Sequence, residues 1–331
     1  ACAINRYITI SGVPSQEGYF TIITPDLETK RVLRFRESIT HPKKGDHLAA
    51  CIKVVAQYGC VPNKGYTITI SGDIPINAGL SSSSAVVVAW IQWLLETFGC
   101  ERKVTPLDIA QLAYEAEVVE QNSPGGKMDQ YTSALGNIVY LETDEQSLHK
   151  NLGNQLEGLI IGASGIPKDT IGLLGDLRGN ALKAIGIVQE KHPSFDLPSA
   201  TLKDYEAYKN DVSKDLQPFF YAAIQNHLIT QTALEALCKP VIDYEEIGSL
   251  MNGHHKVLKD ELKITVPRID AMITAALEAG AYGAKIVGSG GGGSMCTLSP
   301  QGKEATIIEA IKQAGGVDVY PVNVSKGVHI L

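Results

Sequence analysis

The sequence predicts an α+β protein with two domains, and three observations lead to this fold class. Residues 1–72 read mostly as strands, whereas the pattern from about 170 to 280 is mainly helical. The chain has 331 residues, which is enough for about two domains of ordinary size. The change from strand-rich to helix-rich sequence falls near 150–155. We therefore expect a first domain at 1–153 and a second domain at 154–331.

Strands of the first half are recognised by segments rich in Ile, Thr, Val and Tyr between turn residues. These segments read AINRYITISG, GYFTIITPD, RVLRFRES and GYTITISGD. Helices are predicted at about 45–58, 82–98 and 106–121. The last of these has Thr105 as N-cap and Pro106 at the first helical position, which is a strong start signal.

The second half is predicted to be helical until a last long helix, whose start is marked by Thr265 and Pro267. The other elements expected after the first half are strands at 136–143 and 156–164, a strand, glycine loop and strand at 283–299, a helix at about 302–314 and a strand at 317–324.

Composition and charge argue against several classes of protein. Hydrophobic residues make up 44% of the chain and charged residues 20%, which is typical of soluble globular domains. The net charge is −7 and no long basic run occurs, so neither nucleic acid nor an anionic membrane is expected as the main partner. No apolar run reaches the length of a transmembrane helix.

The six cysteines include no CxxC pair and no zinc-type cluster with histidine, so neither a disulfide framework nor a zinc knuckle is expected. A reducing, cytoplasmic location is the prediction that follows. The N-terminal segment also lacks the charged region and cleavage signal of a secretory peptide. The first residue is Ala1 rather than Met, and we expect the chain to begin inside a domain.

The segment PINAGLSSSSA, residues 75–85, places four serines at the start of the most apolar predicted helix. The first N–H groups of a helix have no intrahelical partner, and the helix dipole makes this end attractive to anions. Small residues allow a phosphate to approach these N–H groups, and Gly79 allows a tight turn before them. The segment is therefore suited to a triphosphate. In the alternative, one serine caps the helix and the others have no function.

A glycine loop, GSGGGG at 288–293, formally matches GxGxxG. A dinucleotide-binding turn would need a helix after the glycines, but the strand-like SMCTLSP follows. The P-loop pattern GxxxxGK(S/T) is also absent. A flexible linker is the remaining alternative, and the strand-like AKIV and MCTL on either side argue against it.

An acidic segment, YEAEVVEQNSPGGKMDQYTSALG at 114–136, ends a predicted helix in a Pro-Gly-Gly loop and then presents Asp129. An aspartate beside a nucleotide site can act as a base toward a hydroxyl. Three glutamates precede it, and spacing does not decide between Glu117 and Glu120 as a metal ligand. The alternative is that all three glutamates lie on a solvated face. The apolar stripe expected on this helix consists of Ile109, Leu112, Ala113, Ala116 and Val119, with Glu120 inside it and Glu117 at its border.

Together these segments resemble the GHMP kinase family of galactokinases, homoserine kinases, mevalonate kinases and phosphomevalonate kinases. PINAGLSSSSA is similar to the second family motif and AKIVGSGGGGSM to the third. EAEVVEQNSPGGKMDQ, CAINRY and the run from NGHHKVLK into the third motif are closest to galactokinases. The resemblance covers nearly the whole chain. It implies the two-domain GHMP kinase fold, with a first domain like domain 2 of ribosomal protein S5 and a ferredoxin-like second domain.

The resemblance also implies roles for individual positions. Asp129 matches the catalytic aspartate, which would deprotonate the anomeric hydroxyl of a sugar. Glu117 has the spacing of the glutamate that binds Mg²⁺, which favours it over Glu120, and Ser83 matches the serine that shares this ion. Residues expected at the substrate are Gly126, Lys127 and Asp129. Residues expected to line the site of the ATP phosphates are Gly79, Leu80, Ser81, Ser82, Ser83, Ser84, Gly290, Gly291 and Gly292.

The match departs from the family in two places. The first motif, an Arg followed by Gly-Glu-His-x-Asp, is missing, and it holds the hydroxyls of the sugar in galactokinases. Lys127 stands where galactokinases have Ile, whereas heptose-phosphate kinases of the family tend to have Gly-Lys before their Asp-Gln pair. Lys127 could contact a phosphate or carboxylate of the substrate, or it could be an exposed loop lysine.

The function favoured by the sequence is an ATP- and Mg²⁺-dependent sugar 1-kinase that acts on galactose or a close relative. Alternatives are a heptose-phosphate or uronic-acid sugar kinase, a mevalonate kinase, and a sensor that binds sugar and ATP without turnover. The presence of Asp129, Glu117 and Ser83 argues against the sensor. The expected partners are ATP and a small sugar, and the chain is expected to be a monomer or a homodimer.

Overall fold

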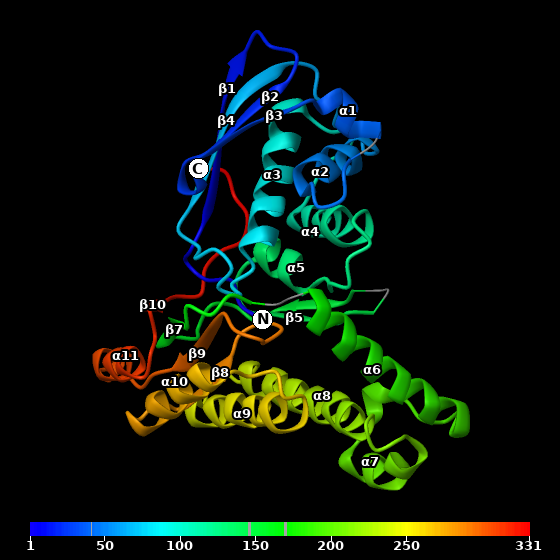
Figure 1. Cartoon of the computed structure of the whole chain (residues 1–331), viewed down its shortest axis with the longest axis vertical. Helices are drawn as coiled ribbons and strands as arrows, with labels where there is room; N and C mark the ends of the chain where they lie inside the picture. Colours follow the sequence, from blue (N-terminus) through cyan, green and yellow to red (C-terminus); the bar gives the residue numbers. More distant parts are fainter. Residues whose placement is uncertain (41, 145–146, 169–170) are drawn as a thin grey trace. The chain divides into compact units, whose positions relative to one another are not determined.

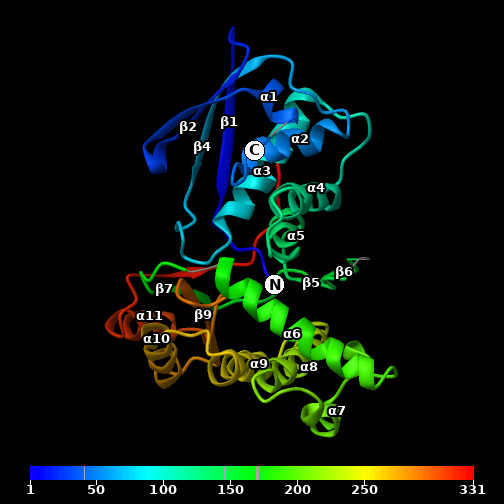
Figure 2. The ribbon, with the colours of Figure 1, turned by 45° about the vertical axis from the view of Figure 1, so that its right-hand side comes forward.

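The computed structural model describes residues 1–40, 42–144, 147–168 and 171–331. These residues form two compact units, each with a hydrophobic core of its own (Figures 1 and 2). The first unit comprises residues 1–76, 81–154 and 324–331, and the second comprises residues 77–80 and 155–323. Both units combine helices with sheets, so the predicted α+β class is confirmed.

The first unit is built on a four-stranded sheet in the order β1–β4–β2–β3. Strand β4 (Gly65–Gly72) pairs antiparallel with β1 (Ile8–Ser15) and parallel with β2 (Phe20–Thr24). Strand β3 (Thr29–Leu33) completes the sheet by antiparallel pairing with β2. Alternate residues of β4 are buried more deeply than their neighbours, as expected when helices cover one face of a sheet.

Helices α2 and α3 cover this face, and α3 is anchored by aromatic residues (Figure 1). The indole of Trp90 on α3 is fully buried, and its N–H donates to the carbonyl of Leu48 at 3.1 Å. Phe20 of β2 packs edge-on against the same indole, with ring centroids 5.8 Å apart. The N-terminal turn of α3 therefore has a defined place in the first unit. The helices and further strands of the first unit are α1 (Phe35–Thr40), α2 (His47–Ala56), α3 (Ser82–Phe98), α4 (Pro106–Tyr114), the π-helix η2 (Glu115–Val119), α5 (Met128–Leu135), β5 (Val139–Leu141) and β6 (His149–Asn151).

The second unit has a four-stranded antiparallel sheet in the order β10–β7–β9–β8. Its strands are β7 (Leu159–Ala163), β8 (Gly283–Ile286), β9 (Ser294–Leu298) and β10 (Asp318–Val322). Apolar residues of α10 and α11 pack on this sheet, whereas α6, α7 and α8 surround a separate cluster that includes Phe195 and Phe220. The helices are α6 (Ile171–Lys191), α7 (Leu202–Tyr208), α8 (Gln217–Leu237), α9 (Tyr244–Lys256), the π-helix η5 (Val257–Glu261), α10 (Pro267–Glu278) and α11 (Glu304–Gln313).

Two predicted elements of the first unit differ from the structure. The segment RVLRFRES was predicted as a strand, but β3 ends at Leu33 and α1 begins at Phe35. The ring of Phe35 is buried against Phe20, with ring centroids 4.8 Å apart, so tertiary packing overrides the local strand propensity. The helix predicted over 106–121 is α-helical only to Tyr114 and continues as the π-helix η2.

Two stretches belong to a different unit from the one that the predicted division at 153/154 would give them. Residues 77–80 lie in the second unit, where the Ser294 hydroxyl donates to the Ala78 carbonyl at 2.7 Å. Residues 324–331 lie in the first unit, where Val324 forms a β-bridge with Ile4. Such pairings join residues far apart in the sequence, so no local sequence pattern predicts them. None of the described helices is long and apolar enough to cross a membrane.

Candidate active site

The serine run forms the start of α3, as predicted. Ser81 precedes the helix in the left-handed conformation, with φ of 57°, and its side chain makes no capping hydrogen bond. No acidic residue lies in the first turn. The structure therefore does not support the alternative in which Ser81 serves as a side-chain cap, and the first N–H groups of α3 keep the capacity to bind an anion.

The π-helix η2 changes which glutamate faces inward. A π-helix adds a residue to the turn and so shifts the side chains that follow relative to an α-helical wheel. Glu117 is only 8% exposed, whereas Val119, which the predicted apolar stripe placed inside, is 59% exposed. The predicted stripe is thus wrong at its C-terminal end. Glu120 lies outside the site and pairs with Lys53, whose Nζ is 2.5 Å from its Oε1.

Glu117 belongs to a buried polar cluster with two neighbours. The side-chain amide of Gln130 donates to Oε2 of Glu117 at 2.7 Å, and it also approaches the Ser84 hydroxyl at 3.4 Å. Gln130 is 3% exposed and its Oε1 has no hydrogen-bond partner among the described residues. The Gln of Met-Asp-Gln thus has a structural role that the sequence reading did not assign. Its place next to Asp129 was the available signal.

The cluster fits a bound cation. A buried carboxylate is costly unless it is paired with a positive charge or a metal. Within the described parts of the chain, Glu117 has no ion-pair partner. Those parts also contain no group of three or more His, Cys, Asp and Glu residues that could hold a metal. A single carboxylate with a hydroxyl is nevertheless a suitable protein contribution for Mg²⁺, which keeps water and phosphate ligands.

The two serines at this end of α3 differ in their surroundings. Ser84 is 3% exposed and lies at the Gln130 amide, whereas Ser83 is exposed. The hydrogen bonds of the cluster therefore lead from Glu117 through Gln130 to Ser84. The family resemblance pointed to Ser83 as the serine at the metal, and that assignment stays a prediction.

Asp129 stands in the first turn of α5 and is partly exposed. Its carboxylate has no hydrogen bond or ion pair among the described residues, although the amide nitrogen of its chain neighbour Gln130 donates to Glu117 in the cluster. A carboxylate in this state is available to accept a proton from a bound hydroxyl. It also lies one residue from a side chain that holds Glu117, so α5 connects the candidate base to the candidate metal ligand.

Lys127 and Gly126 lie at the start of α5. The ammonium of Lys127 donates to the carbonyl of Asp144 at 2.7 Å and to the hydroxyl of Ser147, and it stands 5.4 Å from the ring centroid of Tyr114. These contacts attach it to Asp144 and Ser147 of its own unit. Lys127 is thus partly buried rather than an exposed loop lysine, and a role toward the substrate stays a prediction. Gly126 is exposed, and a Cβ there would meet nothing within 4 Å.

The other predicted phosphate-loop residues form two glycine turns in the second unit. Along 77–80 the backbone φ is positive at Asn77 and Gly79 and negative at the residues that follow each of them, and it is positive again at Ser81, where the first unit resumes. In the second turn, Gly288 and the four glycines 290–293 also have positive φ. The alternation in the first turn points successive N–H groups into a concave nest that suits anions. In the second turn the N–H groups of Gly291 and Gly293 donate to the carbonyls of Ile264 and Ile166. The two turns touch, because the Ser294 hydroxyl donates to the Ala78 carbonyl and Gly293 leaves no room for a side chain beside it.

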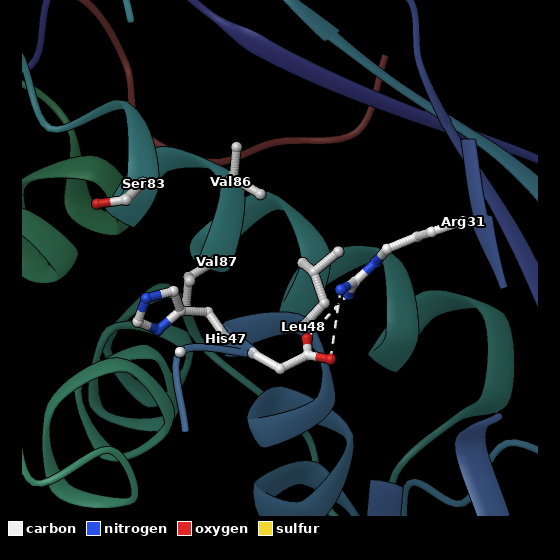
Figure 3. A pocket seen from close by; sticks show the side chains of 8 residues that line it. Arg31, His47, Leu48, Ser83, Val86 and Val87 are labelled. Carbon is white, nitrogen blue, oxygen red and sulfur yellow. Dashed lines mark hydrogen bonds and ion pairs between the residues drawn. The ribbon is translucent and has the colours of Figure 1, made fainter. Parts of the chain in front are cut away.

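A cavity of about 270 Å³ lies beside the serine end of α3 (Figure 3). Leu48, Val86 and Val87 give it apolar walls. The imidazole of His47 lines it with a buried Nδ1 that has no hydrogen-bond partner among the described residues. Arg31 also lines it and is held by Asp46, with Nη2 2.9 Å from Oδ1. Sequence reasoning did not find this cavity, because its walls come from β3, α2 and α3.

Known proteins resemble the chain in both sequence and fold. The model of the GHMP kinases N terminal domain matches residues 46–137, and the GHMP kinases C terminal model matches residues 233–317. A mevalonate kinase of Thermococcus sibiricus is 29% identical over 81% of this chain and 69% of its own length. A galactokinase of Mannheimia succiniciproducens is 26% identical over 99% of this chain and 88% of its own length.

Solved structures agree with this assignment at the level of the fold. Lactococcus lactis galactokinase complexed with galactose has a TM-score of 0.86 at 19% identity, over 98% of this chain and 87% of that one. Methanococcus jannaschii mevalonate kinase has a TM-score of 0.68 at 21% identity, over 98% and 90%. A kinase family of this kind implies the use of ATP and of a small substrate. Since family models match in both halves and the fold is galactokinase-like, the chain belongs to the GHMP kinase family.

Proposed function

We propose that the protein uses ATP and Mg²⁺ to phosphorylate a sugar at its C1 hydroxyl. The observation that carries this proposal is the buried carboxylate of Glu117, which is held by Gln130 and has no cationic partner among the described residues. A carboxylate of this kind is suited to a metal ion that accompanies a nucleotide. Asp129, which directly precedes Gln130 on α5, supplies the second carboxylate that such a reaction needs.

In this proposal the residues divide the work by position. N–H groups at the start of α3 and in the 77–81 turn hold the triphosphate. Glu117 with Ser83 or Ser84 holds Mg²⁺, which neutralises charge on the phosphates when bound. Asp129 orients the sugar hydroxyl and accepts its proton as the oxygen attacks the γ-phosphate. Most of the rate enhancement then comes from positioning and charge neutralisation.

We further propose that the cavity beside α3 receives the adenine of ATP. Ser83 belongs both to the cavity lining and to the serine run. The apolar walls of Leu48 and Val87 suit a flat base, and the unpartnered Nδ1 of His47 can hydrogen-bond to its edge. This placement supports ATP as the phosphoryl donor, because base and phosphate sites adjoin on one helix.

Galactose or a close relative is the proposed acceptor, and mevalonate is the second candidate. The Mannheimia galactokinase aligns over 99% of this chain, whereas the Thermococcus sibiricus mevalonate kinase aligns over 81%. The latter is the more similar in identity, at 29% against 26%. The wider alignment favours a sugar, and the higher identity keeps mevalonate as the candidate to test against it.

The test is Mg²⁺- and ATP-dependent release of ADP over a panel of galactose, glucuronate, galacturonate, arabinose, heptose 7-phosphate and mevalonate. Asp129→Asn should lower kcat by about 10²–10⁴-fold, because it removes the base without changing the size of the side chain. Asp318→Asn, an exposed aspartate of β10, is the matched control and should keep full activity.

Turnover of one sugar, lost in Asp129→Asn and kept in Asp318→Asn, would support the proposal and identify the acceptor. Turnover of mevalonate alone would overturn the proposal that the acceptor is a sugar and would support the proposal that the protein is a kinase. Binding of ATP and sugar with no turnover by the wild-type protein would overturn the kinase and favour a sensor.

A further inference from the structure

Lys168 lies between the two glycine turns of the second unit. Its Cδ is 3.5 Å from the position that a Cβ on Gly79 would occupy, and its Nζ is 2.8 Å from the corresponding position at Gly288. The backbone carbonyl of Gly79 is 3.4 Å from that same position at Gly288. The side chain of Lys168 therefore runs along both turns, and its ammonium ends beside the glycine loop.

The segment that carries Lys168 is fastened to the glycine loop by its backbone. The Ser164 hydroxyl donates to the Gly293 carbonyl at 2.7 Å, and the Gly293 N–H donates to the Ile166 carbonyl at 2.8 Å. A Cβ on Gly292 would stand 2.7 Å from the carbonyl oxygen of Pro167. This close packing directs the chain at Lys168 toward the two turns, so the place of its side chain follows from the fold of the second unit.

The positive charge of Lys168 indicates what the side chain can do beside the two turns. Both turns consist of neutral residues, so neither supplies a positive charge of its own, and the alternating φ of the first turn suits an anion. Backbone nests of this kind bind phosphate more tightly when a cation stands beside them, since a hydrogen bond to a charged donor is about twice as strong as a neutral one. Gly288 also leaves the space that the ammonium of Lys168 uses, because a Cβ there would stand 2.8 Å from Nζ.

We propose that Lys168 binds the phosphate groups of the nucleotide and is a phosphate-contacting residue of the site. This inference rests on the proposed function, because it takes ATP as the ligand of the two turns. It adds a residue that neither the sequence motifs nor the site in the first unit includes. The ammonium would contribute a charge that the N–H groups of the turns cannot supply, and it would act on phosphates rather than on adenine.

The experiment is calorimetric titration of ATP and AMP, with Mg²⁺ present, into the whole chain and three variants. Lys168→Met keeps the stem and removes the charge, and Lys168→Arg keeps the charge. Lys303→Met is the matched control, because Nζ of Lys303 lies 2.7 Å from the Cβ position of Gly280, another glycine with positive φ, outside the two turns. Circular dichroism melting of each variant shows whether it remains folded.

We expect Lys168→Met to bind ATP about tenfold or more weakly, with AMP affinity nearly unchanged, because the lost contact is to the outer phosphates. Lys168→Arg should recover most of the ATP affinity, and Lys303→Met should match the wild type. Equal ATP affinity in Lys168→Met and wild type would overturn the inference and leave the proposed function standing. An equal loss of affinity for ATP and AMP would indicate a structural role of Lys168 and would also overturn the inference. A wild-type protein that binds no ATP would overturn the proposed function itself.

Discussion

The polar cluster around Glu117 in the first unit and the glycine turns of the second unit are built from different parts of the chain. In the cluster, Glu117 and Gln130 use side chains that helices η2 and α5 bring together. In the turns the chain offers its backbone, and glycine is required there because φ is positive and neighbouring atoms are close. A side-chain site should lose function without losing stability when it is mutated, whereas a backbone site should lose both.

The largest effect is expected at Glu117, which tests most directly whether the side-chain cluster differs from the backbone turns. Glu117→Gln removes the charge and keeps the size, so Mg²⁺-dependent kcat/KM should fall at least about hundredfold. Without metal, the free energy of unfolding should rise slightly or stay unchanged, because a buried, unpaired charge is lost. Steady-state kinetics against Mg²⁺ and urea unfolding without metal measure the two effects.

Glu120→Gln is the control for this change. Glu120 pairs with Lys53 at the edge of the same helical segment, so its loss should cost stability of about 0–1 kcal/mol and leave Mg²⁺-dependent activity nearly intact. A greater loss of activity in Glu120→Gln than in Glu117→Gln would show that Glu120, and not Glu117, is the metal ligand.

A smaller effect, on stability, is expected in the glycine turns. At Gly290, φ is +82° and a Cβ would stand 2.4 Å from the carbonyl oxygen of Ile264. At Gly302, φ is +83° but a Cβ would meet nothing within 4 Å. Gly302→Ala should therefore cost only the left-handed backbone, about 1 kcal/mol, while Gly290→Ala should cost roughly 1–3 kcal/mol more from the collision. Urea unfolding of both variants makes the measurement, and equal costs would show that close packing does not constrain this turn.

The effect that is smallest at any one pH step concerns acid, and it is expected in the second unit. Burial lowers the pKa of His254 in α9 from 6.5 to about 3, and Lys285 and His255 add to this shift. Between these pH values the unfolded chain binds a proton that the folded chain does not. Stability is therefore full above about pH 6.5 and is lost as the pH falls toward 3, by at most roughly 1.4 kcal/mol per pH unit for this group.

Both tryptophans, Trp90 and Trp93, lie in the first unit, so their fluorescence reports on it alone, whereas far-UV circular dichroism also follows the helices of the second unit. On acidification the dichroism should change at a higher pH than the fluorescence. His254→Gln should reduce the separation. Coincident transitions in the wild-type protein, unmoved by His254→Gln, would contradict a special acid sensitivity of the second unit.

Local signals predicted much of the secondary structure. Helix α3 begins at Ser82 and α4 at Pro106, where the serine run and the Thr105 cap placed them. These signals work because caps and glycine turns act on neighbouring residues, whose hydrogen bonds can be inferred from the sequence. The strand predicted through RVLRFRES failed at Phe35 because burial of its ring against the sheet, rather than local propensity, decided the conformation there.

The sequence by itself determined the α+β class, the two glycine-containing loops and the acidic residues near Asp129, since each depends on residue type and short spacing. Only the tertiary structure decided which glutamate is buried, because the π-helix η2 interrupts the α-helical period on which any wheel depends. It also decided that residues 77–80 pack with the glycine loop of the second unit and that Lys168 lies between the two turns. These are contacts between segments distant in sequence, and they form only when strands and helices pack, so no local pattern can specify them.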